Sequence, residues 1–576
     1  MKLHDMVLLA ALLAGCGGGG ESAPVPVTAA PATPVIPTQP AVPVPPEVTP
    51  VAPVTPADPV APVTPATPVP EPVVPAPYAF TPSTIAGSFL TGYPGHIMVK
   101  ATAVASPGAM VFFKFGSDAA TLFNAPVLSF NKDGTINLDI VPSPSFAPGR
   151  YQGKATIHAC SDEHCAAPLA GSPFQVPYDL LVEPTEGGTQ AFDLRALSAI
   201  AGAPDWAAFQ GNAGHTGFVP VTLAPASFSA RWTWTAPSDT GTRLRISKVG
   251  TGSGRVYVST GPFLDFKRTT HQLYALDEAD GKPRWTHSFA DLIDPIAGPV
   301  AVADGKVYMV ASSRTTSYLF GFDAANGTQQ FRSVLNTTPS TYGAPLVFGN
   351  LIYTETGFGS GLAAFDKTSG AQQFSTPLYG NWDWMPAVDG TAAYAFVGAT
   401  LVVLDRSTGI ERAVINDPNH GIGNVDYISG TPMLGVPGSV TTVNTGLVSG
   451  VGLVNYDIAA SRVRWSAKGE YFFNPAYHNG TIFSVNSKSF ALEARAEMDG
   501  TLAWSWSPPQ ADGYFASDVL VTNNLVFIST TTATYAIDRT SHTVAWRYPA
   551  SGTLALSANG ILYIQSVSAI VAINLK

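Results

Sequence analysis

The sequence predicts an all-β protein in which a proline-rich disordered tether and an immunoglobulin-like β-sandwich precede an eight-bladed β-propeller. Charged residues are only 12% of the chain, about half the roughly 25% that is usual in soluble domains. Glycine (54) and proline (50) are frequent, which favours short strands joined by turns over helical bundles. The net charge of −10 disfavours a non-specific nucleic-acid binder, and no interior apolar run is long enough for a membrane-spanning helix.

The N-terminus has the features of a bacterial lipoprotein. Residues 1–15 are predicted to be a signal peptide. The stretch Leu13-Ala14-Gly15-Cys16 resembles a lipobox, in which Cys16 is acylated and becomes the mature N-terminus. Gly17 in place of an aspartate suggests outer-membrane delivery, so we expect a protein anchored by lipid at the cell outer membrane. An ordinary secretory signal with an incidental cysteine is the alternative.

Residues 16–77 are predicted to be a tether. There are 20 prolines between Glu21 and Pro77. Proline fixes φ and removes a backbone donor, so this segment should be extended or disordered. The tether would then set how far the following domains can reach from the membrane.

Residues 78–183 form a domain-sized block of short apolar segments separated by turn residues. Strands are expected at residues 96–103, 110–115, 136–140, 151–159 and 174–182. About 100 residues of such strands suggest an immunoglobulin-like sandwich. The part from Gly149-Arg150-Tyr151 to Gly171-Ser172-Pro173-Phe174 resembles bacterial immunoglobulin-like modules. Residues 184–204 are expected to be a linker.

Two cysteines lie close together in this block. Cys160 and Cys165 belong to the stretch His158-Ala159-Cys160-Ser161-Asp162-Glu163-His164-Cys165. In an oxidising envelope, two cysteines at this spacing favour a disulfide. The alternative is a metal site built from both thiolates with His158 and His164, which an oxidising compartment disfavours.

Residues 205–576 contain an internal repeat. Leu273–Trp285 reads LYALDEADGKPRW, Leu319–Phe331 reads LFGFDAANGTQQF, and Leu362–Phe374 reads LAAFDKTSGAQQF. The aligned register positions are Asp277, Asp323, Asp366, Asp405, Asp457, Ala496, Asp538 and Asn574. Their spacing is near 40 residues, and such a period with strand patterning indicates a propeller of four-stranded blades.

Each repeat predicts a tight hairpin. The aspartate carboxylate can accept backbone N–H bonds in the turn, at Asp277, Asp323, Asp366, Asp405, Asp457 and Asp538. Glycines needing positive φ follow four residues later, at Gly281, Gly327, Gly370 and Gly409. Aromatic wedges between blades are expected at Trp285, Phe331, Phe374, Trp465, Trp504 and Trp546, whereas the fourth repeat has Ala413. The regular recurrence favours structural aspartates over a catalytic or calcium-binding set.

The last repeat stops before its outer strand. Residues 228–234, which include Trp232, can supply that strand from the N-terminal side of the domain. This pairing would close the ring at eight blades and leave no open sheet edge.

The repeats, with the preceding Asp205-Trp206-Ala207-Ala208-Phe209-Gln210-Gly211-Asn212 and His215-Thr216-Gly217, resemble the pyrroloquinoline-quinone-like β-propeller family. Members include quinoprotein dehydrogenases and the eight-bladed lipoprotein of the outer-membrane β-barrel assembly machine. The lipobox and the eight repeats are similar to the second, which implies a scaffold. Quinoprotein dehydrogenases hold their cofactor between a tryptophan and an adjacent-cysteine disulfide, and this propeller contains no cysteine.

Two function classes follow. The first is a lipid-anchored scaffold whose propeller face binds an envelope protein or polymer, with no cofactor, metal or nucleic acid. The second is a quinoprotein-type oxidoreductase or other enzyme that uses the central channel, where Trp382, Asp383 and Trp384 either line a face or pack inside blade four. The missing cysteine pair favours the scaffold. Binding loops are expected at Gly261–Gln272 and Gly435–Gly450, which depart from the repeat.

Overall fold

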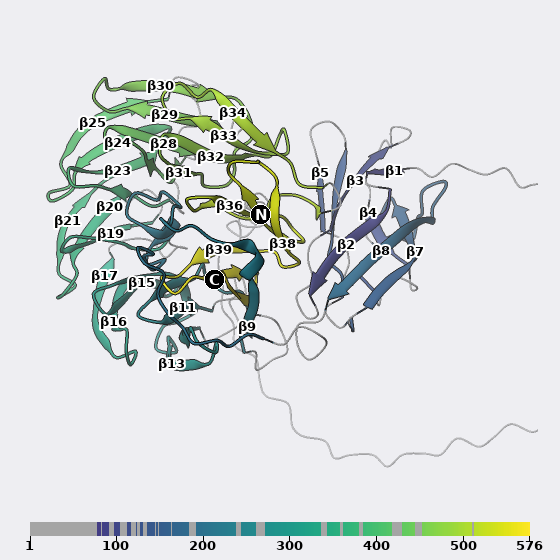
Figure 1. Ribbon diagram of the computed structural model, residues 1–576, viewed down its shortest axis with the longest axis horizontal. Coiled ribbons are helices and arrows are strands. Elements are labelled where there is room, and N and C mark those ends of the chain that lie inside the picture. The colour runs from purple at the N-terminus through teal and green to yellow at the C-terminus, as the bar shows by residue number, and fades with distance from the viewer. Residues whose placement is uncertain are drawn as a thin grey trace, which may run out of the picture. The chain divides into compact units, whose positions relative to one another are not determined.

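The computed structural model is built almost entirely from β-strands (Figure 1). It describes residues 78–81, 83–90, 97–103, 112–116, 122–123, 127–130, 135–143, 146–147, 149–162, 164–183, 192–237, 244–260, 271–335, 343–357, 361–378, 384–417, 429–443, 452–509 and 512–576. The predicted signal peptide, Cys16 and the tether lie outside these residues. The two helices described are single 3-10 turns, η1 (Phe209–Gly211) and η2 (Pro225–Ser227). The described part has no helix that is long and apolar enough to cross a membrane. The all-β prediction is confirmed.

Residues 78–183 form two four-stranded sheets. The first has the order β1 (Tyr78–Thr81), β3 (Ile97–Ala103), β6 (Ile136–Ile140), β5 (Val127–Phe130). The second has the order β2 (Ile85–Leu90), β8 (Phe174–Glu183), β7 (Gly149–Cys160), β4 (Phe112–Phe115). All neighbours are antiparallel except β2 and β8, which are parallel. The alternate residues Ala155, Ile157 and Ala159 of β7 are buried in a core that both sheets share.

Five of these eight strands lie where the sequence predicted examples of strands, and β1, β2 and β5 were not among those examples. β1 and β5 have four residues each, and β2 contains Gly87 and Ser88, which carry little strand propensity. Pairing with longer strands, such as β8 beside β2, supplies the stability that these segments do not encode locally.

From residue 192 on, the described residues form eight sheets of antiparallel strands. Sheet one contains β10 (Gly250–Gly252), β11 (Arg255–Ser259), β12 (Gln272–Asp277) and β13 (Pro283–Ser288). Sheet two contains β14 (Ile296–Ala303), β15 (Lys306–Ser312), β16 (Ser317–Asp323) and β17 (Gln329–Leu335). Sheet three contains β18 (Leu346–Phe348), β19 (Leu351–Glu355), β20 (Leu362–Asp366) and β21 (Gln372–Thr376). Sheet four contains β22 (Ala387–Val388), β23 (Ala392–Val397), β24 (Thr400–Asp405) and β25 (Glu411–Asn416), with β26 (Ser429–Gly430) paired to β23.

The later sheets follow the same plan. Sheet five contains β27 (Met433–Leu434), β28 (Ser439–Val443), β29 (Leu453–Asp457) and β30 (Arg462–Ala467). Sheet six contains β31 (Ala476–His478), β32 (Thr481–Asn486), β33 (Ala491–Ala496) and β34 (Leu502–Trp506). Sheet seven contains β35 (Leu520–Val521), β36 (Leu525–Ser529), β37 (Thr534–Asp538) and β38 (Val544–Tyr548). Sheet eight contains β39 (Thr553–Leu556), β40 (Ile561–Gln565), β41 (Ala569–Asn574) and β9 (Ser229–Thr235).

Sheet eight joins the two ends of this propeller. β9 pairs with β41 so that Trp232 lies opposite Ala572, which confirms the closing strand that the sequence predicted. Residues 192–204, expected to be part of a linker, instead pack on this sheet. The Asp193 N–H donates to the Ala230 carbonyl at 2.9 Å, and the Ile200 N–H donates to the Ala558 carbonyl at 2.8 Å. The propeller part of the chain therefore begins before residue 205.

The antiparallel order of four strands gives each sheet two different ends. The first-to-second and third-to-fourth strand connections meet at one end, which we call the turn end. The second-to-third connections and the links to the next sheet meet at the other, which we call the loop end. Turn-end connections are tight, as at residues 253–254, 304–305 and 278–282, whereas loop-end connections include 236–249, 260–271 and 507–519.

Candidate functional site

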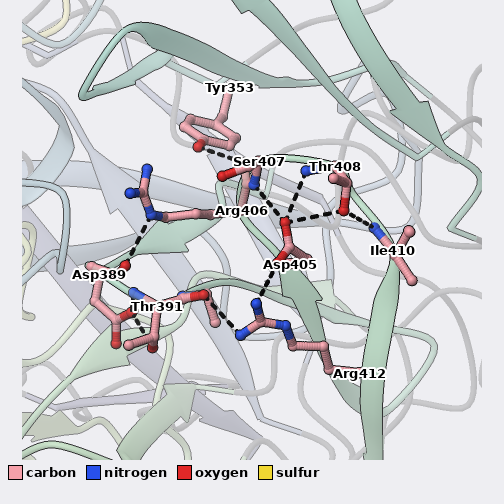
Figure 2. A network of polar contacts seen from close by, with 11 residues as sticks. Tyr353, Asp389, Thr391, Asp405, Arg406, Ser407, Thr408, Ile410 and Arg412 are labelled. Atoms are coloured by element: carbon pink, nitrogen blue, oxygen red, sulfur yellow. Dashed lines mark hydrogen bonds and ion pairs between the residues drawn. The ribbon is translucent and has the colours of Figure 1, made fainter.

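The repeated aspartate lies in the tight turn after the third strand of a sheet, drawn for sheet four in Figure 2. The N–H groups of Ser407 and Thr408 each donate to Asp405 Oδ1 at 2.9 Å. Arg412 donates to the other carboxylate oxygen. The backbone N–H of Ser407, the Thr408 hydroxyl and Arg412 together lower the pKa of Asp405 to about 2. Both oxygens of Asp405 are thus engaged within its own repeat.

The same turn recurs in the other sheets. A backbone N–H two or three residues ahead donates to the carboxylate of Asp277, Asp323, Asp366, Asp457 and Asp538. The glycines of the turn have positive φ: 71° at Gly281, 74° at Gly327, 72° at Gly370 and 71° at Gly409. Within the described residues, no group of three or more histidine, cysteine, aspartate or glutamate side chains could hold a metal ion.

An aromatic side chain of one sheet covers the turn glycine of the next. A Cβ built on Gly281 would lie 2.7 Å from the Trp232 ring, and one on Gly327 would lie 2.5 Å from the Trp285 ring. The same contact pairs Phe331 with Gly370, Phe374 with Gly409 and Trp465 with Gly500, while Trp504 stacks on His542. Trp546 instead packs edge-on against Phe228. The wedges that cover a glycine leave no room for a side chain in the facing turn, whereas Trp504 packs on the His542 ring.

The wedge side chain also donates a hydrogen bond to a backbone carbonyl of the neighbouring turn where it is a tryptophan. The indole N–H of Trp285 donates to the Ala324 carbonyl at 3.0 Å. A phenylalanine cannot donate, and there a tyrosine of the second strand is the donor, as Tyr257 also is to the Ala324 carbonyl beside Trp285. The Tyr308 hydroxyl donates to the Lys367 carbonyl at 3.0 Å, and the Tyr353 hydroxyl donates to the Arg406 carbonyl at 2.7 Å. Figure 2 shows the second of these bonds entering the Asp405 turn.

Residues 205–217, which we call the girdle, run past the first strands of successive sheets. Their carbonyls accept backbone N–H bonds from Thr251 of sheet one, Val302 of sheet two, Val388 of sheet four, Leu434 of sheet five, Tyr477 of sheet six and Val521 of sheet seven. Neighbouring first strands contact one another, so the girdle occupies the centre of the propeller.

The girdle residues hold one another in place. Trp206 covers Gly211, which has φ of 81°, and Asn212 Oδ1 accepts the N–H groups of Gly214 and Thr216. His215 Nδ1 lies 2.9 Å from the Pro432 carbonyl and therefore donates to it. Burial lowers the pKa of His215 to about 4, so this imidazole is neutral near pH 7. The motif that leads into the repeats is thus explained by packing and hydrogen bonding.

Comparison with known families agrees with this geometry. The family described as outer membrane protein assembly factor BamB matches residues 193–382 and 339–506, which together are more than half of the chain. The chain belongs to the BamB family. The match begins inside the predicted linker, at the segment that packs on sheet eight.

Solved structures with a similar arrangement are distant in sequence. The crystal structure of BamB from Moraxella catarrhalis is 15% identical, with a TM-score of 0.46, and the match covers 61% of this chain and 98% of that chain. The computationally designed Ika8 protein is 11% identical, with a TM-score of 0.45, and the match covers 58% and 98% of the two chains. The search of curated proteins gave no match.

The channel of this BamB-family propeller is nearly filled by the girdle. A cavity of about 30 Å³ lies beside Trp206, Phe209 and Val300. That volume suits about one water molecule, whereas pockets for small molecules are usually about 300–1,000 Å³. This cavity is therefore too small for a quinone cofactor. Trp384 is buried in a core cluster with Leu346 and belongs to the packing of sheet four; Trp382 and Asp383 lie outside the described residues.

An ion pair lies beside this cavity. Lys248 Nζ donates to Asp518 Oδ2 at 2.7 Å and lies 4.5 Å from the centre of the Phe209 ring. Burial opposes ionisation of Asp518, but Lys248 and two donors of Asn474 outweigh it and lower the pKa of the carboxyl. No local sequence pattern indicates this pair, because its members are 270 positions apart.

The two predicted binding loops have different outcomes. Of Gly261–Gln272, only His271 and Gln272 are described, and Gln272 begins β12 at the loop end. The prediction of one loop at Gly435–Gly450 is wrong. Gly435–Gly438 is a turn at the turn end, and Ser439–Val443 is the buried strand β28. Alternating small and β-branched residues form a strand here, and residues 444–450 lie outside the described part.

The cysteines of the N-terminal sheets are close enough to bond. The structure pairs Cys160 with Cys165, whose Cα atoms are 5.1 Å apart. Asp162 organises the intervening turn, since its carboxylate accepts the N–H groups of His164, Ala166 and Ala167. That carboxylate is used by the backbone of the turn rather than held out toward a ligand.

Proposed function

We propose that the protein is a lipid-anchored scaffold of the cell envelope that binds a protein partner through the loop end of its propeller. The observation that carries this proposal is the contrast between the two ends of the sheets. Tight turns of recurring geometry close one end, while the connections at the other end differ widely in length on the same scaffold, from residues 398–399 to residues 236–249. Recognition residues are usually placed on such connections.

The eight sheets are proposed to be the blades of one ring. Each has four consecutive strands in order, except that sheet eight takes its outer strand from β9. With this closure every blade has its outer strand, and the repeats hold the connections in fixed positions. A rigid ring with variable connections supports binding without requiring a catalytic group.

The two N-terminal sheets are proposed to be an immunoglobulin-like spacer. Named A, A′, B, C, D, E, F and G along the chain, their strands have the orders A-B-E-D and A′-G-F-C. These are the sheets of an immunoglobulin sandwich with an added A′ strand. The Tyr151 hydroxyl donates to the Ala147 carbonyl at 2.9 Å near the start of strand F, as in a tyrosine corner. We propose that the Cys160–Cys165 disulfide ties off the end of this strand.

Anchoring at the outer membrane is proposed from the lipobox and the family together. The matching family is named for an outer membrane protein assembly factor, and Cys16 is placed for acylation. Cys16→Ala should release the mature chain from the membrane fraction, because no other anchor is proposed. Membrane retention of the variant, after a salt wash, would refute the anchor but not the scaffold.

Photo-crosslinking in intact cells tests the scaffold. A crosslinking residue at Phe472, 51% exposed at the loop end, is compared with one at Met498, 60% exposed at the turn end. We expect a distinct protein adduct at Phe472, and direct binding once that protein is purified. Adducts at Met498 alone, or none at several loop-end positions, would contradict the proposal.

A further inference from the structure

The loop end of sheet two exposes two large aliphatic side chains. Ile293, in the connection from β13 to β14, is 67% exposed, and Val334, near the end of β17, is 52% exposed. The Arg314 N–H donates to the Ile293 carbonyl at 2.8 Å, and Val334 lies opposite Tyr318 in the strand ladder. Both aliphatic side chains therefore border the same group of polar residues.

Arg332 is held at the centre of this group. Its guanidinium carbon lies 3.8 Å from the centre of the Tyr318 ring, and Nη1 lies 2.6 Å from Asp291 Oδ2. Asp291 belongs to the connection that carries Ile293, so the ion pair fastens that connection to β17. A stacked and paired arginine loses little conformational freedom when a partner binds.

Arg314 is engaged less tightly. Its side chain is 74% exposed, and its Nε lies 3.6 Å from Asp294 Oδ2, beyond hydrogen-bond distance. The planar guanidinium can bind a carboxylate through two parallel N–H bonds. Arg314 therefore offers an anion-binding group beside the apolar contact area.

We infer that Ile293, Arg314, Tyr318, Arg332 and Val334, the Arg332 surface, bind a partner-protein segment that carries apolar side chains beside a carboxylate. Tyrosine and arginine beside exposed aliphatic groups have the composition of interface hot spots. The exposed Arg314 guanidinium is complementary to a carboxylate and the exposed Ile293 and Val334 are complementary to apolar side chains, which favours a partner segment of this chemistry. The inference deepens the proposed function, since it places the partner's chemistry at one part of the loop end.

Synthetic peptides test the chemistry. Fluorescent peptides would share the same leucines and differ only in whether the polar positions are acidic, neutral or basic. We expect the acidic peptide to bind the full-length protein most tightly. Arg314→Glu should weaken binding of the acidic peptide about tenfold and should increase the affinity for the basic peptide. Equal binding of all three peptides would overturn the inference. So would an Arg314→Glu variant that still prefers the acidic peptide as strongly as the wild type does.

Two matched substitutions test whether the peptide binds at the Arg332 surface. Ile293→Asp and Ile410→Asp both alter isoleucines that are 67% exposed, but Ile410 lies at the turn end. Only Ile293→Asp should weaken binding of the acidic peptide, by about tenfold or more, and the melting temperature should be unchanged in both variants. Equal losses of peptide affinity in the two variants would overturn the inference. Sedimentation that shows a dimer of the wild type, dissociated by Ile293→Asp, would also overturn it, because the occupant would then be a second copy of the chain. Loop-end crosslinks that survive Ile293→Asp would leave the scaffold standing and remove only the Arg332 surface.

Discussion

Sheets one to three and sheets four to six fill the space between neighbours in different ways. In the first group each repeat has the complete set of aspartate, glycine and aromatic residue. In the second group Ala413 stands where the wedge is expected, Ser461 replaces a turn glycine and Ala496 replaces a turn aspartate. The propeller closes in both regions, so the repeat motif is one way to build a junction and not the only one.

Backbone and core contacts replace the missing wedge between sheets four and five. β25 and β30, the outer strands of these two sheets, contact each other directly. β26, which leads into sheet five, pairs with β23 of sheet four. The rings of Phe396 and Tyr456 lie 6.3 Å apart inside a core that both sheets share. This junction therefore depends on close approach of strands, whereas the others depend on a large side chain.

Removing a wedge should have the largest effect. Trp232→Ala leaves a cavity over Gly281 and removes one of two donors to the Glu278 carbonyl, which accepts the indole N–H at 2.9 Å and Arg231 Nε at 3.1 Å. Trp232 is 3% exposed, so we expect a loss of about 3–5 kcal/mol in the free energy of unfolding. Chemical denaturation measures it. Trp232→Phe, which keeps the wedge and loses the bond, should cost only about 1 kcal/mol.

Adding one methyl group to a wedge turn should cost somewhat less. Gly327→Ala places a side chain at φ of 74° and 2.5 Å from the Trp285 ring, which should destabilise the protein by about 2–4 kcal/mol. Gly305→Ala is the matched change, at φ of 73° with no atom within 4 Å of the added Cβ, and should cost only about 1–2 kcal/mol. In a Trp285→Ala background Gly327→Ala should lose most of its effect. Additive losses would show that the ring contact is not the cause.

Restoring the motif at the junction between sheets four and five should not stabilise it. Ala413→Phe brings back the aromatic residue, but β25 already lies against β30 and leaves little room. We expect overpacking to cost about 1–3 kcal/mol in the free energy of unfolding. A rise in stability would instead reveal unfilled space, and would show that this junction is a weakened copy of the others.

Short-range patterns in the sequence were sufficient for the repeat. The aspartate, the glycine and the aromatic residue lie within nine positions of one another, so a single hairpin displays the full relation. The strand supplied by residues 228–234 also follows from counting, because one repeat lacks its outer strand. The turn of the motif can therefore be placed before any tertiary contact is known.

Long-range contacts had no comparable signal. Lys248 meets Asp518 across the channel, and Gln210 donates to the Pro475 carbonyl across 265 positions. β1 has only four residues and β2 contains Gly87 and Ser88, so neither has a strong strand pattern without its partner, and Gly435–Gly450 looks like a loop because glycines surround β28. The Arg332 surface joins residues of two strands and two connections. In each case the stabilising partner lies far along the chain, and the local residues alone do not specify the structure.

The smallest expected effect concerns the turn aspartates and acid. The folded pKa of Asp405 is about 2, below its ordinary value of 3.8, so the native state favours the carboxylate form. Its contribution to stability is therefore complete above about pH 4 and is lost as the pH falls through about 2. Asp405→Ala should lower the melting temperature slightly at pH 6, and the difference from wild type should shrink toward pH 2.

Sheet six offers the reverse experiment, because Ala496 has the same turn, with the Gly500 N–H donating to the Ala496 carbonyl at 2.9 Å. Ala496→Asp should raise the melting temperature at pH 6 and lose that gain over the same acid range. If neither variant differs from wild type in its pH dependence, the carboxylate adds nothing to a turn that glycine geometry and the wedge already determine.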